Sequence, residues 1–510
     1  MTLQFFKKMG LFLSVFAFSV FMRVPVIYSE EEQPQITSRE QNFILGVTKI
    51  YRLTLEEVTK LALENNFDIQ LAKYDTWIKR TDQDVAESIY DTILSAEVKY
   101  EDDQRKKTST ISGNKTVNND YNMSLSKKLP SGTTLDLDMT NNRKWTNSAF
   151  VTSSLTHESK LGMSLTQELG KNFLGIQDRG DVKISKIDIE NTEYASLGKI
   201  EDKIAEVQKA YWDLVYQSEM LKIEEEMVVQ AKRLYDLNQE KLINGLVEIP
   251  EAVASEANYI SRKNDLMFVR NQLKTKVNIL KLLLNITDED IQIEPAYDLK
   301  ISDISLTFPE ALKETFTHRR DYKKALNDIR SKDIKLTMKK NNIWPEINLT
   351  ASLERNGLGD HFKQAVTQIT EEDHPKLFAG LTFNFPLENK DAMAQLKAAQ
   401  LEKAKVLLNL KLLERQITID VIDQLRDCNV FKEIAFNSTQ IAQLQTKKLE
   451  EEEKRFLHGR SDTDTLIRFQ EDLIKAKESA VEAARRYHSA LVDLLVKEGT
   501  LLNQYWDGEI

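Results

Sequence analysis

Residues 245–284 have the sequence GLVEIPEAVASEANYISRKNDLMFVRNQLKTKVNILKLLL, and this stretch decides the fold. Beyond its first residue, Gly245, apolar side chains recur every three or four positions, at Leu266, Val269, Leu273, Val277, Leu280 and Leu284. The same spacing precedes the glycine, at Ile204, Val207, Tyr211, Leu214 and Leu221. A stripe of this kind is one face of a helix that must be buried. The pattern predicts a helical hairpin over Asp181–Asn285, with arms of roughly 60–90 Å at ~1.5 Å per residue.

A second long stretch has the same character. From Leu387 to Glu498 there is no proline and a single glycine, Gly459. The apolar positions that follow this glycine are Leu466, Phe469, Leu473, Ala476, Ala480, Ala483, Tyr487, Ala490 and Leu494. Helices of globular proteins average about three or four turns, so arms of this length indicate coiled-coil rods. Two rods, each reversed at a lone glycine, indicate internal duplication.

The duplication extends to the segments before the rods. A constant offset aligns Leu53 with Leu306 and Asp68 with Asp321, and each leucine is predicted to begin a helix. We therefore predict two repeats, 53–295 and 296–505, followed by a short tail over 506–510. Each repeat is expected to contain a helix, strands and a long helical hairpin.

The first residues have the features of a targeting segment. Lys7 and Lys8 precede an apolar run, Leu11–Met22, and the small residue Ser29 follows. This arrangement predicts a signal peptide over 1–29 and a flexible leader over 30–52. The apolar run is shorter than the ~20 residues that a membrane helix needs, and no other stretch approaches that length. No transmembrane helix is therefore expected in the mature chain.

Composition excludes several classes of function. A net charge of −10, without a basic patch, argues against a nucleic-acid partner. The single cysteine, Cys428, excludes a disulfide within the chain and is expected to be a small buried hydrophobic residue. The six histidines have no metal-ligand spacing, and no nucleophile, phosphate-loop or dinucleotide motif is present. We expect no catalysis, no cofactor and no metal.

Apolar residues alternate strictly with polar ones in six segments. Four lie between about 93 and 167, beginning near Leu94, Tyr121, Leu135 and Leu161, and two lie between about 347 and 385, near Ile347 and Ala379. Strict alternation predicts strands with one apolar and one polar face. The intervening segments, about 101–119, 141–157 and 354–376, are long and polar, which predicts loops.

Two arrangements suit such strands. They could form a small soluble sheet packed against the helices, or a membrane barrel with apolar residues toward lipid and Glu97, Asp136 and Asp138 toward a wet lumen. A secreted chain with no apolar helix favours the barrel. Because four or six strands cannot enclose a pore, several subunits would each contribute a sector.

Four passages carry a family resemblance: the openings LTLEEV at Leu53 and LTFPEA at Leu306, Trp344–Pro345 before a strand, GLTFNFPLENKDAMAQLKAAQLEKAK at Gly380, and the turns NGLVEIPEAV and FLHGRSDTDTL. With these passages in this order, the chain resembles the TolC-family outer membrane efflux proteins over Leu53–Leu502. The resemblance implies a mainly α fold with a membrane β-barrel sector, in which a long α-helical coiled-coil barrel joins a trimeric β-barrel. The implied function is a passive exit duct of a tripartite efflux or type I secretion system.

The resemblance also implies partners and a location. Three copies would form one β-barrel in the Gram-negative outer membrane and one helical barrel in the periplasm. The glycine turns would form the periplasmic tip, which docks a periplasmic adaptor and, through it, an inner-membrane pump of the RND or ABC type. The residues expected at this docking tip are Gly245, Leu246, Gly459 and Arg460.

The tip would also hold the gate. The candidates are Glu251, Phe456, Asp462, Asp464, Thr465 and Arg468. Close relatives narrow the tip with aspartates soon after the second glycine, where this chain has Thr465 and Arg468. Glu251 and Arg460 could pair across a closed tip. Phe456 would line the constriction or, as we favour, pack between helices.

Two further points separate the alternatives. Family members commonly have four strands per chain, so the Tyr121–Met139 hairpin either widens the barrel or is an extracellular elaboration. A secreted coiled-coil structural or adhesive protein with a soluble sheet is the main alternative function. A periplasmic adaptor would have one hairpin flanked by lipoyl-like and β-barrel domains, unlike this chain.

Overall fold

The computed structural model describes residues 50–107, 111, 113–288, 291–297, 301, 307–371 and 375–506. All of them belong to the second of two units, Ile50–Ile510. The predicted signal peptide and most of the predicted leader lie outside the described residues, as does Leu306, where the second repeat was expected to begin its helix.

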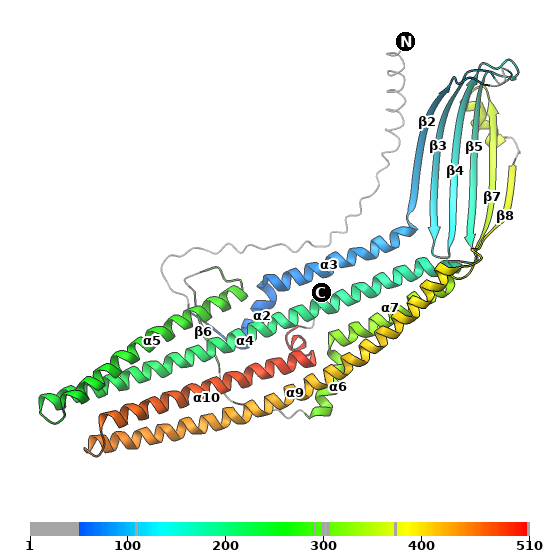
Figure 1. The fold of residues 1–510 in the computed structure, drawn as a ribbon. Coiled ribbons are helices and arrows are strands. Elements are labelled where there is room, and N and C mark those ends of the chain that lie inside the picture. Colours follow the sequence, from blue (N-terminus) through cyan, green and yellow to red (C-terminus); the bar gives the residue numbers. More distant parts are fainter. Residues whose placement is uncertain are drawn as a thin grey trace, which may run out of the picture. The chain divides into compact units, whose positions relative to one another are not determined.

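The chain passes twice through a similar series of elements (Figure 1). The first series is β1 (Ile50–Leu53), α2 (Leu55–Asn65), α3 (Phe67–Glu87), β2 (Thr92–Asp103), β3 (Thr116–Leu129), β4 (Thr133–Thr146), β5 (Leu155–Glu168), α4 (Ile176–Ile243) and α5 (Ile249–Leu283). The second is β6 (Gln292–Pro295), α6 (Phe308–His318), α7 (Arg320–Asn341), β7 (Glu346–Gly359), α8 (Phe362–Glu371), β8 (Pro375–Asn384), α9 (Lys390–Leu457) and α10 (Thr463–Glu498). Helices, strands and a long hairpin thus recur in the predicted order, although β1, β6 and α8 were not anticipated.

The two helical hairpins have unequal arms. Helices α4 and α9 each contain 68 residues, or about 100 Å at 1.5 Å per residue. Their partners α5 and α10 contain 35 and 36 residues, or about 50 Å. The arms are unequal because α4 and α9 continue past their partners to the sheet, where α3 and α7 pack beside them. Away from the sheet, the neighbouring helices follow the order α5, α4, α10, α9 (Figure 1).

The single helix expected to begin at Leu53 is instead two helices that meet at Asn66. Its side chain accepts a hydrogen bond from the Ile69 amide at 3.1 Å and donates to the Leu283 carbonyl at 2.7 Å. Asn66 therefore caps α3 while it holds the end of α5. The last residues of the predicted leader, Ile50–Arg52, lie in β1, which pairs with β6 in parallel.

The predicted apolar stripe of α4 forms the main core. Ile204, Val207, Tyr211 and Leu214 are each at most 1 % exposed. The Tyr211 hydroxyl donates to the Ala296 carbonyl at 2.9 Å, which satisfies its only buried polar atom. The helical periodicity therefore identified the buried face correctly.

Cys428 lies in a smaller core between α9 and α10. Its Sγ donates to the Ala490 carbonyl at 3.3 Å, and the residue is fully buried. Burial raises the pKa of the Cys428 thiol to about 11. The prediction of a small buried hydrophobic residue is confirmed.

The ring of His488 on α10 stacks on Trp212 of α4, with 3.8 Å between centroids and 8° between planes. His488 is buried, and its Nε2 atom has no hydrogen-bond partner among the described residues. Burial lowers the pKa of His488 to about 4, because the charged form would lose its water.

Acid should therefore weaken the packing of α4 on α10. The unfolded state binds this proton below a pKa of about 6.5, whereas the folded state binds it only below about 4. Stability is thus fully present above the unfolded pKa and falls as the pH decreases from 6.5 to 4, by up to about 3 kcal/mol per chain. Urea unfolding in detergent at several pH values should show this loss, and His488→Phe, which keeps the stacked ring, should remove it. His458→Phe, at an exposed histidine, is the control; equal pH slopes in all three proteins would contradict the argument.

All six predicted strands join one antiparallel sheet in the order β2–β3–β4–β5–β7–β8. The strands are longer than the apolar alternation, because polar pairs such as Asn118 with Lys144 continue the ladder. The predicted loops are correspondingly shorter than expected. The β3–β4 hairpin, whose place the sequence left open, is part of the sheet.

The register brings the apolar residues onto one face. One row crosses all six strands and consists of Leu94, Leu125, Leu137, Met163, Leu353 and Leu377. All six side chains are exposed in the isolated chain, from 41 % for Leu125 to 79 % for Leu377. The opposite face is polar: Asn122 donates to Glu97 at 3.2 Å, and Ser126 donates to Asp136. This row therefore needs a cover that the described helices of the same chain do not supply, since α8 covers only the far end of this face, at Ser159 and Gly357.

Helix α8 packs across β5 and β7 at the end of the sheet far from the long helices (Figure 1). A Cβ atom at Gly357 would lie 2.0 Å from the Ala365 carbonyl oxygen, so only glycine admits the helix. Ala365 and Ile369 are the buried side chains of α8. Among the described residues, no helix has an apolar stretch long enough to span a bilayer.

Candidate functional site

The two hairpin tips have the same backbone geometry. At the first tip the Gly245 amide donates to the Leu242 carbonyl and the Leu246 amide donates to Lys241. At the second the Gly459 amide donates to Phe456 and the Arg460 amide to Arg455. Both patterns are Schellman caps, in which the residue after the helix takes a left-handed conformation. Gly245 and Gly459 have φ of 68° and 71°, so each glycine is required by the turn.

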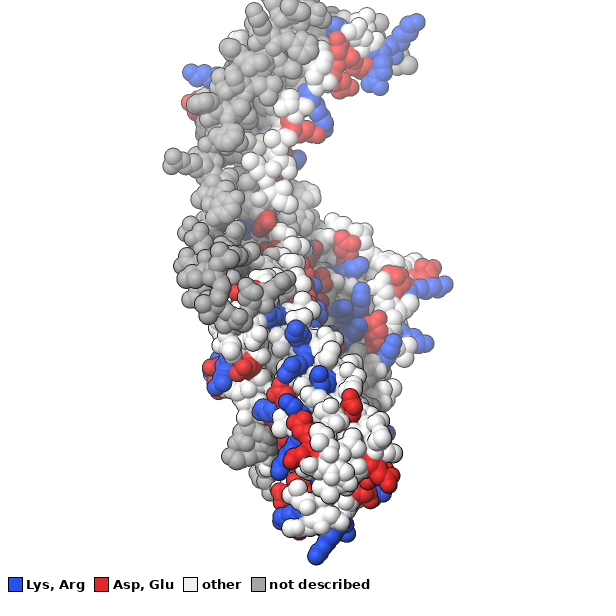
Figure 2. Space-filling view, turned by 90° about the vertical axis from the view of Figure 1, so that its left-hand side faces the viewer, with Lys and Arg blue, Asp and Glu red and all other residues white. Residues whose placement is uncertain are grey.

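Apolar side chains cluster at the first tip. Ile243, Leu246 and Ile249 are 85 %, 72 % and 68 % exposed. At the second tip Arg460 is exposed beside Gly459. Figure 2 faces this end of the helices and shows uncharged surface interspersed with side chains of both charges. The predicted docking residues therefore lie at the surface of the two turns.

A buried polar contact joins the two hairpins just behind the tips. The Asn238 amide of α4 donates to the Thr463 hydroxyl of α10 at 3.1 Å. The same hydroxyl lies 3.4 Å from a carboxylate oxygen of Glu251, to which it donates. Asn238 and Thr463 are fully buried. Within one chain, Glu251 is therefore held by Thr463, and its pairing with Arg460 across a closed tip stays a prediction.

The other gate candidates divide into packed and exposed residues. Phe456 is only 4 % exposed and packs in an apolar cluster, with the Lys241 ammonium 4.2 Å from its ring centroid. This position agrees with the packing role that we favoured. Asp464 and Arg468 are exposed on α10. They are free to face a lumen if copies of the chain surround one.

Asp462 has a structural task. Its carboxylate accepts a hydrogen bond from the Thr465 amide at 2.7 Å and caps α10, and the Thr465 hydroxyl also donates to it. These two hydrogen bonds hold the pKa of Asp462 below its usual value. The pair therefore fixes the first turn of α10, whichever residues line a constriction.

Replacing Thr463 with valine should loosen the contact between the hairpins. Valine has a similar shape but cannot bridge Asn238 to Glu251, and a lost buried hydrogen bond costs about 1–3 kcal/mol. Amide hydrogen exchange in both tip turns should then accelerate about fivefold or more. The control is Thr465→Val, because that hydroxyl bonds only within its own turn. Unchanged exchange in Thr463→Val would show that the contact does not hold the tips.

Along the helical layer, exposed apolar residues form stripes at its two edges. On one edge, α3 exposes a stripe at steps of three, four and seven: Phe67, Leu71, Tyr74, Ile78 and Val85. Helix α5 on the same edge exposes Val253, Ile260, Met267, Phe268, Ile279 and Leu282. On the opposite edge, α9 exposes Met393, Leu401, Leu408, Leu412, Ile419, Ile422, Val430, Ile434, Ile441 and Leu444. Helix α10, described throughout, exposes no large apolar side chain. Stripes of this kind normally face another helix.

Solved structures share the fold of this chain. The Campylobacter jejuni CmeC outer membrane channel is 17% identical, with a TM-score of 0.63 over 88% of this chain and 85% of that chain. The open-state Neisseria gonorrhoeae MtrE outer membrane channel is also 17% identical, with a TM-score of 0.63 over 88% of this chain and 89% of that one. The chain has the TolC-like outer membrane channel fold.

A third structure with the TolC-like fold is the Vibrio cholerae outer membrane protein VceC, at 13% identity and a TM-score of 0.63 over 87% of this chain and 96% of that chain. No family model and no curated protein matches the sequence. The identities are low, so the likeness rests on the arrangement of helices and strands.

Sequence reasoning missed two buried polar residues near the tips and a groove along α4 of this TolC-like chain. Near the second tip, the buried carboxylate of Glu452 accepts hydrogen bonds from Ser461 and Arg455, at 2.5 Å and 3.1 Å. Glu452 belongs to an acidic run whose other members are solvated, so composition alone could not single it out. Asn238 was missed because a lone asparagine within a long helix gives no signal until its partner helix is known.

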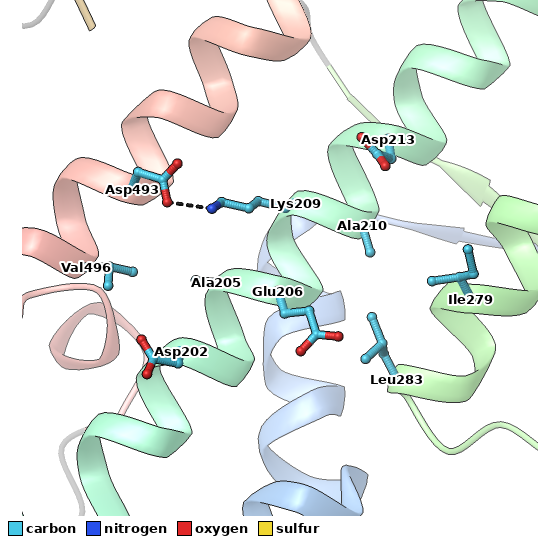
Figure 3. A pocket seen from close by; sticks show the side chains of 10 residues that line it. All are labelled: Asp202, Ala205, Glu206, Lys209, Ala210, Asp213, Ile279, Leu283, Asp493 and Val496. Atoms are coloured by element: carbon cyan, nitrogen blue, oxygen red, sulfur yellow. Dashed lines mark hydrogen bonds and ion pairs between the residues drawn. The ribbon is translucent and has the colours of Figure 1, made fainter. Parts of the chain in front are cut away.

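The third missed feature is an acidic groove of about 430 Å³ along α4 (Figure 3). Its lining residues are Asp202, Ala205, Glu206, Lys209, Ala210, Asp213, Ile279, Leu283, Asp493 and Val496. Lys209 pairs with Asp493 at 2.5 Å, and Lys276 pairs with Asp213 at 2.7 Å. Among the described residues, no cluster of metal-ligating side chains occurs here or elsewhere. Its carboxylates are thus largely engaged with cations of the same chain.

Proposed function

We propose that the chain is one sector of a passive exit duct in the outer membrane of a Gram-negative envelope. Three copies would form a β-barrel in the membrane and a helical barrel in the periplasm. Substrates would pass from an inner-membrane pump of the RND or ABC type, through a periplasmic adaptor, to the exterior. The chain itself would supply no catalysis, so energy would come from its partners.

The observation that carries this proposal is the open six-stranded sheet with its exposed apolar face. A soluble protein rarely exposes an apolar face of this extent, whereas lipid would cover it at no cost. No described strand pairs with the outer edges of β2 and β8, and closure of a barrel is the usual way to satisfy such edges in a membrane. The same observation argues against a secreted adhesive protein with a soluble sheet.

The helical layer supports ring formation independently. Its two edges are apolar and differ from each other, so the α9 edge of one copy can pack against the α3–α5 edge of the next. Such a head-to-tail interface closes into a ring when the rotation between copies permits. The number three comes from the family resemblance.

The tips would provide the docking site and the gate. The exposed Leu246 and Arg460 flank glycine turns that leave open space around their Cα atoms, which suits close approach of an adaptor's helices. In the closed ring, Asp464 and Arg468 would face the tunnel axis together with Glu251. The Asn238–Thr463 contact would then hold each pair of hairpins in register.

Single-channel recording in planar bilayers tests the duct. The full-length mature protein, extracted in detergent, should insert and give discrete conductance steps. Loosening the tip with Glu251→Ala or Arg460→Ala should increase the conductance. A protein that is a soluble monomer without detergent and gives no steps, with or without these substitutions, would refute the proposal.

A further inference from the structure

We propose that the membrane sector of the assembled duct is an eighteen-stranded barrel, as wide as its helical section, whose exit admits bulky, hydrated cargo. The inference rests on the proposed function, because three copies are needed to close the barrel. It depends on a feature of this chain, the full integration of the β3–β4 hairpin into the sheet.

The hairpin contributes two complete strands. β3 and β4 contain 14 residues each and pair along their whole length, from Thr116 with Thr146 to Leu129 with Thr133. Their outer neighbours are β2 and β5, so the hairpin lies inside the sheet and not beyond its edge. Because β2 does not contact β5 directly, the hairpin cannot leave the sheet without opening it.

The turn of the hairpin is built into the junction between sheet and helices. A Cβ atom on Gly132 would lie 2.9 Å from the Gly175 amide nitrogen, and one on Gly175 would lie 2.3 Å from the Pro130 carbonyl oxygen. Beside this contact, Lys128 of β3 pairs with the buried Asp178 of α4 at 2.8 Å. The hairpin therefore helps to position the start of α4. A loop elaboration at the far end of the sheet could not make these contacts.

The lipid-facing row also requires all six strands. Leu125 and Leu137 lie between Leu94 and Met163 in the same row, so the apolar face continues through the hairpin. Six is an even number, so β8 of one copy and β2 of the next run antiparallel and can pair. Three copies then close a barrel of eighteen strands.

Geometry relates this strand number to the helices. With strands about 4.8 Å apart and tilted by about 40°, eighteen strands enclose a barrel roughly 36 Å across between backbones, and twelve strands only roughly 24 Å. Four helices per chain, α5, α4, α10 and α9, lie side by side at one level. Three copies give a ring of twelve helices, which at a spacing of about 9–10 Å is roughly 37 Å across. The diameter of an eighteen-stranded barrel therefore matches that of the helical ring, whereas a twelve-stranded barrel would be narrower than the ring.

The consequence concerns cargo size. Side chains take about 5 Å from each wall, which leaves roughly 25 Å for passage through an eighteen-stranded barrel. The polar face that would line it includes Ser124, Asp136, Asp138, Ser164 and Glu354, from four of the strands. Such a lumen suits polar cargo that keeps its water, up to about 20 Å across. The tip would then be the one narrow point.

Electron microscopy of the full-length protein in lipid nanodiscs tests the inference, with a deletion of Thr116–Thr146 as the matched variant. The deletion joins the loops after β2 and before β5, so it leaves an even, antiparallel set of four strands per chain. We expect eighteen strands and a width near 36 Å in the native protein, and twelve strands near 24 Å in the variant. Polyethylene glycols of about 20 Å added on the exit side should lower the conductance of the native channel but not that of the variant.

The outcomes are distinguishable. A three-fold ring that forms pores through only twelve strands, with the hairpin displaced, would overturn the inference and leave the duct intact. The absence of any ring or pore would overturn the proposed function itself. If the deletion variant does not fold, the strand count and the polymer size limit of the native protein still decide the question.

Discussion

Replacing Leu125 with arginine is expected to prevent insertion of the protein into lipid. Leu125 belongs to the apolar row that crosses all six strands, and its side chain is exposed in the isolated chain. Arginine on the lipid face of a barrel costs about 2–4 kcal/mol near the bilayer midplane. In the proposed ring, three copies would carry the substitution, so the assembly would lose about 6–12 kcal/mol. Urea-dependent folding into lipid vesicles should show the loss directly.

The adjacent residue supplies the control for this experiment. Ser124→Arg places the same side chain at nearly the same depth on the polar face, where it lies across from Asp138. Folding of this variant should stay close to that of the native protein. Equal impairment by both substitutions would mean that the apolar row does not face lipid, and the barrel interpretation would fail with it.

The second large effect is expected at the edge of the helical layer. The double variant Ile78→Glu, Val85→Glu changes two members of the α3 stripe, which are 67 % and 70 % exposed in one chain. If α9 of the next copy covers them, each native side chain contributes about 1.5–3 kcal/mol to the interface. The change should weaken each interface about 10²–10⁴-fold. Native mass spectrometry in detergent should then detect monomers in place of trimers.

The matched control is Val229→Glu on α4. Val229 is exposed to a similar fraction (68 %) but lies away from both edges. It should leave the oligomer intact. Circular dichroism should show full helix content in both variants, since none of the three positions is buried within the chain. Trimers that survive the double substitution would exclude the α3 edge as an interface.

The regular parts of this fold were predictable because their signals are local. Both glycine turns were located from sequence, since a long apolar stripe interrupted by Gly245 or Gly459 allows few structures other than a capped reversal. The strands were located by alternation alone. Their common register followed only from the structure, because alternation states which residues share a face and not which strands are neighbours.

The sequence-based predictions failed where contacts between distant segments decide the local structure. Asn66 divides a helix that periodicity predicts as continuous, because its side chain binds a carbonyl of α5, a partner more than two hundred positions away in sequence. Helix α8 lies in a segment whose polar composition suggested a loop, and it exists because Gly357 leaves room for it. At the tip, Glu251 and Phe456 were recognised as important, but their partners in the other hairpin were not.

The burial of Cys428 has a practical consequence for every experiment above. A thiol with a pKa near 11 is almost entirely protonated at neutral pH, and maleimides and spin labels react with the thiolate. The native Cys428 should therefore react little with such reagents. A cysteine introduced at Leu246 or Arg460 should accept a probe selectively, so that movements of the two turns can be followed without first removing any natural residue.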